Sequence, residues 1–266
     1  VMPLGVKILT FFKIMDIPNI RKIHKNPIPS TGGIIIFLCF LVSIILLFPS
    51  HSLIPAYLIG SSFLVFIGLM DDIKPLSPNV KFMTQILAGF IFISLTKITF
   101  IIPGFENSLF LSFIITLFFI VSVTNALNLI DGMDGLASGI SIIILTIISI
   151  YSGFQFSLVS IILISCIFGF LRANSFPAMI FMGDSGSYFL GYSIAVFILI
   201  MFDNTNISIL NIPIILGIPF FDTTLVFFKR LLNRQSIFTP DKNHIHHLLQ
   251  RLKIQHKNVV FLLYSI

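Results

Sequence analysis

The stretch LFLSFIITLFFIVSVTNALNLIDGMDGLASGISIIILTIISIY, residues 109–151, holds two long apolar runs separated by a short polar turn. Two Asn and two Asp fall at a spacing of three at that turn: Asn125, Asn128, Asp131 and Asp134. Apolar runs of this length with so few charges are typical of helices that cross a bilayer. The stretch therefore predicts two membrane-spanning helices joined by a polar turn.

The composition of the whole chain agrees with this interpretation. Of 266 residues, 56% are hydrophobic and only 10% are charged, and the mean hydropathy is +1.07. A soluble domain carries about a quarter charged residues, so we expect an integral protein of the lipid bilayer. The net charge of +6 does not indicate a nucleic-acid partner, because excess Lys and Arg in membrane proteins face the cytoplasm and anionic lipid.

Further apolar runs of near-spanning length repeat along the chain. They lie at 33–49, 53–70, 83–102, 108–127, 136–153, 157–173, 186–202 and 209–228. Because the runs are continuous rather than alternating, they exclude a β-barrel. We expect an all-α, polytopic bundle of about eight complete spans with partial spans at both ends. It would form a single domain over 1–266, truncated at the C-terminus, with truncation of the N-terminus left open.

The connections between these runs divide into two sets by charge. One set, formed by 16–32, 71–82, 128–135, 174–185 and 229–258, holds 12 Lys and Arg, and the other set, formed by 50–52, 103–107, 154–156 and 203–208, holds none. The positive-inside rule makes the first set cytoplasmic. Seven of the ten carboxylates lie in the same set, so we expect any chemistry at the cytoplasmic face of the inner membrane.

A pair of adjacent carboxylates, Asp71 and Asp72, lies where one run ends, in GLMDDIKPLSPNVKF (68–82). Two adjacent carboxylates repel each other unless a metal ion or a lysine joins them. Mg²⁺ suits such a pair, since it binds one or two carboxylates together with substrate phosphates. A solvated loop with charged ends is the alternative.

The polar turn of the opening stretch also favours a ligand site. Successive residues three apart rotate by roughly 60° about a helix, so Asn125, Asn128 and Asp131 share one broad face. Two glycines then let the chain leave the helix, which places Asp134 on a turn. Polar groups at a hydrocarbon boundary usually face a wet cavity, although a helix end satisfied by its own backbone is the alternative.

The segment SFPAMIFMGDSGSYFLG (175–191) places Asp184 between Gly183 and Ser185 at the start of a span. Glycine lets the backbone approach a ligand, and a helix N-terminus offers donors to an anion. A carboxylate at that point indicates a metal that bridges to phosphate. An ordinary N-cap explains the same residues.

A histidine cluster follows in TPDKNHIHHLLQRL (239–252). Thr239 and Pro240 predict a helix start, and an apolar stripe suits a helix on the membrane surface. His244 and His247 then share a polar stripe, whereas His246 points elsewhere on an ideal helix. Without nearby sulfur ligands, a hydrogen-bonding clamp for phosphate fits better than zinc. An amphipathic helix with incidental His is the alternative.

A basic loop, RKIHKNPIPSTGG (21–33), ends in Gly32 and Gly33 at the start of a span. It either binds an anion or anchors the topology. By helix parity all five polar motifs return to one face of the membrane. Together they supply carboxylates, cations and glycine-rich anion sites, which are the groups needed for phosphoryl transfer.

These ordered motifs resemble a known family. DD at 71–72, NALNLIDGMDGLA at 125–137, FMGDSGS at 181–187 and HIHH at 244–247 are similar to the polyprenyl-phosphate N-acetylhexosamine-1-phosphate transferases, glycosyltransferase family 4. The loop at 16–33 also resembles their first cytoplasmic loop. The HIHH form resembles the undecaprenyl-phosphate GlcNAc-1-phosphate transferase branch more than the phospho-MurNAc-pentapeptide translocase branch, which stays the alternative.

The resemblance implies a reaction in which a UDP-N-acetylhexosamine, by default UDP-GlcNAc, reacts with polyprenyl (undecaprenyl) phosphate. The products are polyprenyl-diphospho-sugar and UMP, the first step of a lipid-linked envelope glycan such as O-antigen or another cell-wall polymer. Mg²⁺, or alternatively Mn²⁺, is the implied cofactor, and a homodimer is left open. GalNAc, QuiNAc or FucNAc donors are alternatives to GlcNAc.

The resemblance also implies roles for individual residues. It makes Asp184 and Asp72 metal ligands, and it places Asp71, Asp131 and Asp134 with them in the catalytic site. The implied substrate-binding residues are Asn125, Asn128, Lys81, His244, His246, His247, Gly183, Ser185, Gly32 and Gly33. Of Asp131 and Asp134, we expect Asp131 to lie nearer the chemistry.

An ion-coupled transporter is the competing hypothesis from another class. Transporters place functional carboxylates near the bilayer midplane on broken helices. Here the mid-span regions are nearly free of charge, with Lys97 and Asp222 as partial exceptions. This distribution favours a transferase.

Overall fold

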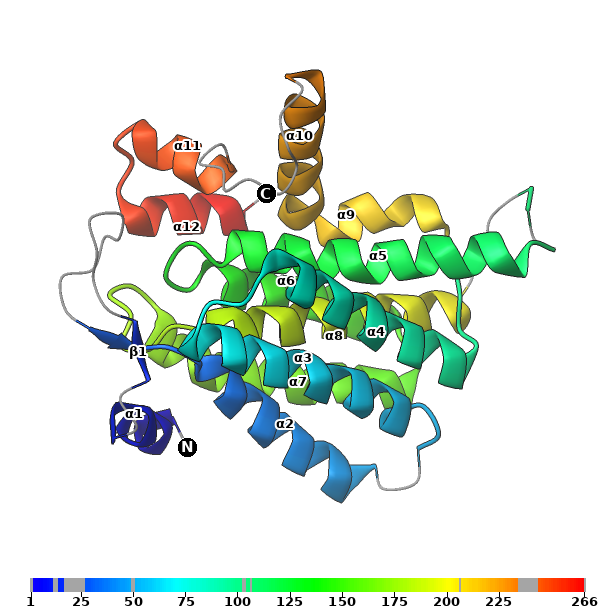
Figure 1. The fold of residues 1–266 in the computed structure, drawn as a ribbon, viewed down its shortest axis with the longest axis horizontal. Coiled ribbons are helices and arrows are strands. Elements are labelled where there is room, and N and C mark those ends of the chain that lie inside the picture. The colour runs from blue at the N-terminus through cyan, green and yellow to red at the C-terminus, as the bar shows by residue number, and fades with distance from the viewer. Residues whose placement is uncertain are drawn as a thin grey trace.

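A computed structural model describes residues 2–11, 14–16, 27–48, 51–101, 104–105, 107–205, 207–233 and 244–265. Its elements are α1 (Met2–Phe11), β1 (Met15–Asp16), β2 (Ile28–Pro29), α2 (Gly32–Leu47), α3 (Ile54–Ile73), α4 (Pro78–Thr96), α5 (Leu109–Ile130), α6 (Leu136–Tyr151), α7 (Phe154–Asn174), α8 (Gly183–Asp203), η1 (Ile209–Asn211), α9 (Ile212–Leu216), α10 (Ile218–Leu232), α11 (Ile245–Arg251) and α12 (His256–Tyr264). Figure 1 shows α2 to α8 running roughly along one common axis. The predicted all-α, multi-pass membrane bundle is confirmed.

Fewer helices reach full spanning length than the eight expected. Within the described ranges, α3, α4, α5, α7 and α8 are long and apolar enough to cross a membrane, and the bent pair α9–α10 would make a sixth. Helices α2 and α6 are apolar but have only 16 residues each, which rise about 24 Å. A hydrocarbon core is about 30 Å thick, so these two runs are shorter than a full span.

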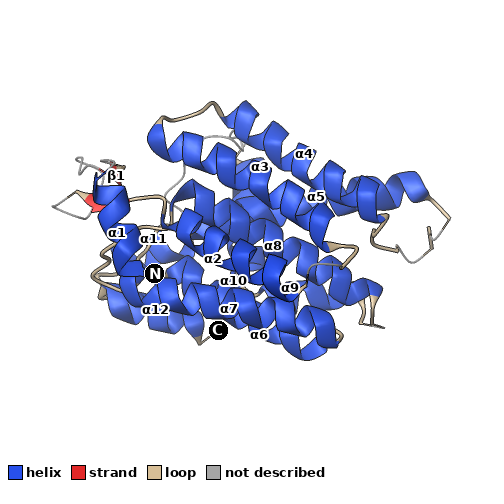
Figure 2. Ribbon diagram, turned by 90° about the horizontal axis from the view of Figure 1, so that it is seen from below, coloured by secondary structure: helices blue, strands red, loops and turns tan. Residues whose placement is uncertain are grey.

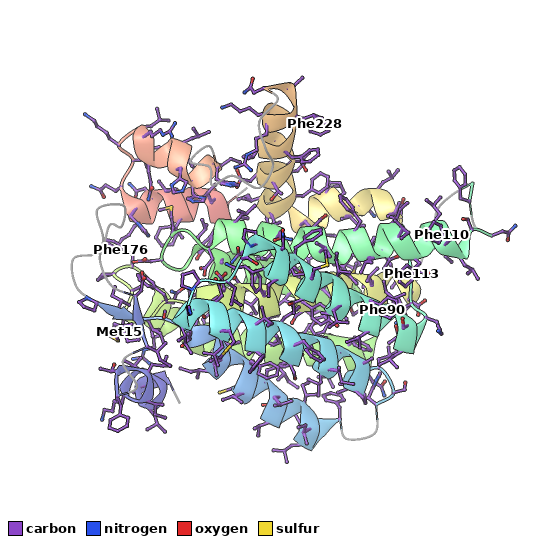
Figure 3. All side chains as sticks on the ribbon, viewed as in Figure 1. Met15, Phe90, Phe110, Phe113, Phe176 and Phe228 are labelled. Atoms are coloured by element: carbon purple, nitrogen blue, oxygen red, sulfur yellow. The ribbon has the colours of Figure 1, made fainter. Side chains whose placement is uncertain are left out.

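The sequence predicted one span over 209–228, but this run does not form one straight helix. Its helices meet at a bend of 98°, where Gly217 has a φ of +51° that favours glycine. Pro213 and Pro219 each lie in the first turn of a helix near the bend, and proline lacks the N–H that a continuous helix needs. As a result α10 stands across the bundle axis, with Phe228 toward its far end (Figures 1 and 3).

Helix α8 forms the centre of the bundle. It packs against α2, α3, α5 and α6, and 94% of its spanning window is buried. Small residues allow this close packing: a Cβ on Gly68 would lie 2.4 Å from the Ser185 backbone, and one on Gly191 would lie 2.6 Å from Thr124 Cα. Such residues let helix backbones approach in membranes. The polar N-terminus of α8 is thereby held among the ends of its neighbours.

The short pair β1–β2 is antiparallel and pairs Met15 with Pro29. Figure 2 shows it beside one end of the helical bundle. Pro29 O also accepts a hydrogen bond from Phe181 N, at 2.8 Å. The pair therefore ties the start of α2 to the segment that precedes α8.

Candidate active site

Four helix ends meet at one end of the bundle. Asp71 and Asp72 lie in the last turn of α3, Lys81 in the first turn of α4, Asn128 in the last turn of α5 and Asp184 in the first turn of α8. Antiparallel neighbours joined by short connections bring alternate ends together, which is why helix parity predicted this cluster. The structure brings all five of these predicted site residues into one hydrogen-bonded group.

Asp184 is the hub of this group. Its Oδ1 accepts from Asn128 Nδ2 at 3.0 Å, and its Oδ2 accepts from Lys81 Nζ at 3.0 Å and from Tyr188 OH at 3.1 Å. Lys81 Nζ also donates to Asp71 Oδ2 at 2.5 Å. The lysine therefore bridges two carboxylates, and about a quarter of the Lys81 and Asp184 side chains is exposed, so the group is open to a ligand.

The neighbouring carboxylate, Asp72, makes a different set of contacts. Its Oδ1 accepts from Asp184 N at 2.7 Å, and its Oδ2 accepts from Ser185 Oγ at 2.9 Å. These contacts place a negative charge at the N-terminus of α8, where the helix dipole favours it. Gly183, with a φ of +74°, lies so close that a Cβ would be 2.5 Å from Asp72 Oδ2. The adjacent aspartates thus avoid mutual repulsion because one faces a lysine and the other caps a helix.

Asp131 and Asp134 differ in their partners. Asp134 Oδ2 accepts from Ala178 N at 3.0 Å and so holds the segment between α7 and α8. Asp131 is partly buried, and among the described residues its carboxylate has no hydrogen-bond partner. Burial, followed by the charges of Asp184, Asp72 and Asp134, raises its pKa well above the usual range. Asp131 therefore places an acidic group without a hydrogen-bond partner beside the cluster.

Asn125 lies one turn deeper than Asn128 and does not contact the carboxylates. Its amide group pairs with that of Gln85 on α4: Asn125 Nδ2 donates to Gln85 Oε1 at 2.5 Å, and Gln85 Nε2 donates back at 3.2 Å. Gln85 is 1% exposed. This reciprocal pair joins α4 to α5 directly below Lys81 and Asn128, so in this geometry Asn125 holds the helices that carry the site.

The histidines lie beside the polar turn. His244 Nδ1 and Asp222 Oδ2 are 2.9 Å apart, and α11 begins at Ile245; the expected start at Thr239 and Pro240 falls outside the described residues. His246, which an ideal helix aims away from the other two histidines, is buried beside the turn, and its Nε2 would lie 2.6 Å from a Cβ on Gly132. Burial lowers the pKa of His246 to about 4.

Helix α12 also covers this turn. Tyr264 OH donates to Gly135 O at 2.5 Å, and burial raises the pKa of Tyr264 to about 12. His256 stacks on Phe176 with ring centroids 4.6 Å apart; Phe176 lies at the end of the bundle near α12 (Figure 3). The C-terminal helices therefore brace both the turn after α5 and the segment before α8.

The two glycines at the start of α2 are used in packing. Gly32 N donates to Phe181 O, and Gly33 N donates to Met182 O, each at 2.9 Å. A Cβ on Gly33 would lie 2.0 Å from Gly186 Cα. Their amides are thus engaged by the backbone rather than directed at the carboxylate cluster.

Gly33→Ala is therefore expected to destabilise the protein. Two backbones in contact cannot move apart as a side chain can, so we expect a loss of about 1–3 kcal/mol in the free energy of unfolding. The unfolding midpoint in detergent measures it. Gly169→Ala is the matched control because nothing lies within 4 Å of its Cβ, and equal midpoints for the two variants would contradict the packing role.

Several polar residues of the site were not identified from the sequence. Ser187 Oγ accepts from Asn128 at 2.9 Å. Asn174 Oδ1 accepts from Gly135 N at 3.1 Å, and its Nδ2 donates to Ile180 O at 2.9 Å, so it joins the turn to the segment before α8. Tyr188 and Gln85 were missed as well. Helical spacing could have indicated both, since Tyr188 lies four residues after Asp184 and Gln85 lies four residues after Lys81.

The donor chemistry of the cluster fits a hard divalent cation. In the part of the chain that the structure describes, no three His, Cys, Asp or Glu side chains are arranged around one point as metal ligands. Mg²⁺ does not need such a cage, because it binds one or two carboxylates and completes its shell with water and phosphate. Asp184, Asp72 and Asp131 supply carboxylate oxygens, and the pKa of Asp131 is raised by burial first and then by the charges of the neighbouring acidic groups.

Comparison with known proteins identifies the family of the chain. The chain is 36% identical to a protein of Bacillus subtilis named probable undecaprenyl-phosphate N-acetylglucosaminyl 1-phosphate transferase, over 99% of this chain and 77% of that protein. It is 31% identical to the undecaprenyl-phosphate alpha-N-acetylglucosaminyl 1-phosphate transferase of Escherichia coli K12, over 90% of this chain and 69% of that protein. The decaprenyl-phosphate N-acetylglucosaminephosphotransferase of Mycobacterium leprae is 30% identical, over 93% of this chain and 72% of that protein. Residues 54–202, which include α3, α4, α5 and α8, match the model of glycosyl transferase family 4, and the chain belongs to this family.

Proposed function

We propose that this protein transfers N-acetylglucosamine-1-phosphate from UDP-GlcNAc to polyprenyl phosphate, releasing UMP and starting a lipid-linked envelope glycan. The observation that carries the proposal is the group of Asp71, Asp72, Lys81, Asn128 and Asp184 at four helix ends. Relatives of the chain are named for the same transfer to undecaprenyl or decaprenyl phosphate. A bundle end beside the bilayer is where a lipid phosphate and a water-soluble nucleotide can meet.

In this reaction an oxygen of the lipid phosphate attacks the β-phosphorus of the UDP-sugar. The new P–O bond forms the lipid diphosphate, and the bond between the β-phosphorus and the bridging oxygen breaks, so that the bridging oxygen leaves with UMP. The sugar keeps its bond to the transferred phosphate, and no net proton is released. A phosphate at neutral pH is already an anion, so the protein mainly has to position both phosphates and stabilise their charge.

Each residue of the cluster has a task in this scheme. Lys81 offers a cation between Asp71 and Asp184, where a diphosphate oxygen can replace one carboxylate as its partner. Asn128 donates from Nδ2 toward the same point. Asp72 holds the N-terminus of α8 in place, and neutral His246 offers a ring nitrogen beside the turn.

Mg²⁺ fits this site, with Asp184 as its principal ligand and with Asp72 and Asp131 as further carboxylates. When bound, the ion would neutralise charge on the diphosphate as the UMP group departs. The excess of Lys and Arg on the connections at this end supports a site on the cytoplasmic side of the inner membrane.

The proposal is tested with membranes from a host whose own enzyme of this type is deleted. UMP release is measured with UDP-GlcNAc, polyprenyl phosphate and MgCl₂, and each component is then omitted in turn. We expect release only with all three. UDP-GalNAc in place of UDP-GlcNAc tests the donor, and release without the lipid, or no release with any UDP-sugar, would contradict the proposal.

A further inference from the structure

Asp222 is a buried carboxylate that lies on α10, outside the cluster described above. It is 2% exposed, and both of its oxygens are used: Oδ2 lies 2.9 Å from His244 Nδ1, and Oδ1 accepts from Ile245 N at 2.8 Å. The second contact caps the first turn of α11, and the first orients an imidazole. Asp222 therefore connects the bent helix α10 to the histidine segment.

His244 in turn lies against His246. Their rings are stacked, with centroids 6.0 Å apart and planes 10° from parallel. The contact with Asp222 Oδ2 uses His244 Nδ1 and so sets the orientation of the ring. The position of His246 thus depends on that of His244.

The other side of His246 is set by Gly132. A Cβ at this residue would lie 2.6 Å from His246 Nε2 and within 3.4 Å of two further ring atoms. Among the described residues, Nε2 is buried and has no hydrogen-bond partner. Gly132 has no left-handed φ, so the ring, rather than the backbone, is what an alanine would disturb. His246 Nε2 thus lies beside Gly132, the residue after Asp131, and a ligand bound there could supply its missing hydrogen-bond partner.

We propose that Asp222 and Gly132 are positioning residues that hold His246 at the 131–134 turn, with Asp222 acting through His244. This inference rests on the proposed function, because it assigns His246 a contact with the phosphates of that reaction. Stability alone does not explain the arrangement. A buried pair of this kind contributes little to stability compared with well-packed apolar residues, whereas it does orient a ring.

The test is a double-mutant cycle on purified, detergent-solubilised enzyme. It uses Asp222→Ala, His244→Ala and the double variant, with kcat and KM for UDP-GlcNAc and for the lipid phosphate and with the unfolding midpoint of each protein. We expect each single variant to lower kcat/KM about 10- to 100-fold, as misplaced active-site groups do. The double variant should be no worse than the poorer single variant, because both remove the same support.

Two further variants keep the test decisive if Asp222→Ala does not fold. Asp222→Asn keeps the size of the side chain but cannot satisfy both contacts as an acceptor, and Gly132→Ala displaces the ring from the opposite side. Both should lower kcat/KM in protein that remains folded. The matched controls are Asp203→Asn, at the exposed far end of α8, and Gly153→Ala, which has nothing within 4 Å of its Cβ; both should match the wild type.

Two results would overturn the inference. One is an Asp222→Asn protein that is folded and has wild-type kcat/KM. The other is a cycle in which the losses from Asp222→Ala and His244→Ala multiply, which would mean that Asp222 does not act through His244. A wild-type protein that releases no UMP would instead refute the proposed function itself, so the two failures are distinguishable.

Discussion

Asp184→Asn should lower kcat about 10³-fold while the protein stays folded. The amide has the shape of the carboxylate, but its single oxygen cannot accept from both Asn128 and Tyr188, and the negative charge that faces Lys81 and a divalent cation is gone. Removing one group that stabilises charge in a transition state typically costs about 10²–10³-fold in rate. Asp184 serves both the cation and the lysine, so we expect the upper end of this range.

The measurement is UMP release at saturating UDP-GlcNAc and lipid phosphate, over a series of MgCl₂ concentrations. The unfolding midpoint of the same preparation shows whether the protein is folded. Asp203→Asn is the control, since it removes a carboxylate from the opposite, exposed end of the same helix. Activity within tenfold of wild type for folded Asp184→Asn would show that the hub of the cluster lies elsewhere.

The membrane bundle could be predicted because hydrophobicity is a property of each segment alone. The apolar runs and the partition of Lys and Arg predicted that α3 and α5 end, and that α4 and α8 begin, on the same side of the membrane. This direction of the helices brings Asp71, Asp72 and Asp184 to one end. The bend at Gly217 was missed because the hydropathy of a segment carries no information about the direction of its helix axis. A window over 209–228 is as apolar when its two helices meet at 98° as when they form one rod.

The partners of individual polar residues could not be predicted, because they depend on the rotation of each helix about its own axis. The spacing of three put Asn125 and Asn128 on one helix face, and both were expected to bind substrate. In the structure Asn125 pairs with Gln85, whereas Asn128 donates to Asp184. Likewise Gly32 and Gly33 have the composition of an anion-binding loop, but their amides bond to the carbonyls before α8. Only the packed neighbours of these residues separate the two kinds of role.

Asp131→Asn and Asp134→Asn should have different effects, although both residues lie in one turn. Asp131 has no hydrogen-bond partner among the described residues, and its carboxyl group lies close enough to Asp184 for the charge of Asp184 to raise its pKa. An asparagine offers a divalent cation a neutral ligand in place of a carboxylate, so Asp131→Asn should lower kcat about 10²-fold or more without unfolding the protein. Asp134 holds Ala178 N through a single oxygen, which an asparagine can replace. We therefore expect Asp134→Asn to keep most of the stability and Asp134→Ala to lose about 1–2 kcal/mol.

The pH dependence of stability gives Asp131→Asn a second signature. A carboxyl whose pKa is higher in the folded than in the unfolded protein binds its proton more tightly when folded, so its ionised form disfavours folding. With EDTA present, wild type and Asp131→Asn should therefore have equal unfolding midpoints below about pH 4, near the pKa of an unfolded aspartate. The variant should become the more stable protein as the pH rises from there through the raised pKa of Asp131. A midpoint that falls at neutral pH on Asp131→Asn substitution would mean that this carboxylate holds the fold together, and the division of roles between the two aspartates would then be wrong.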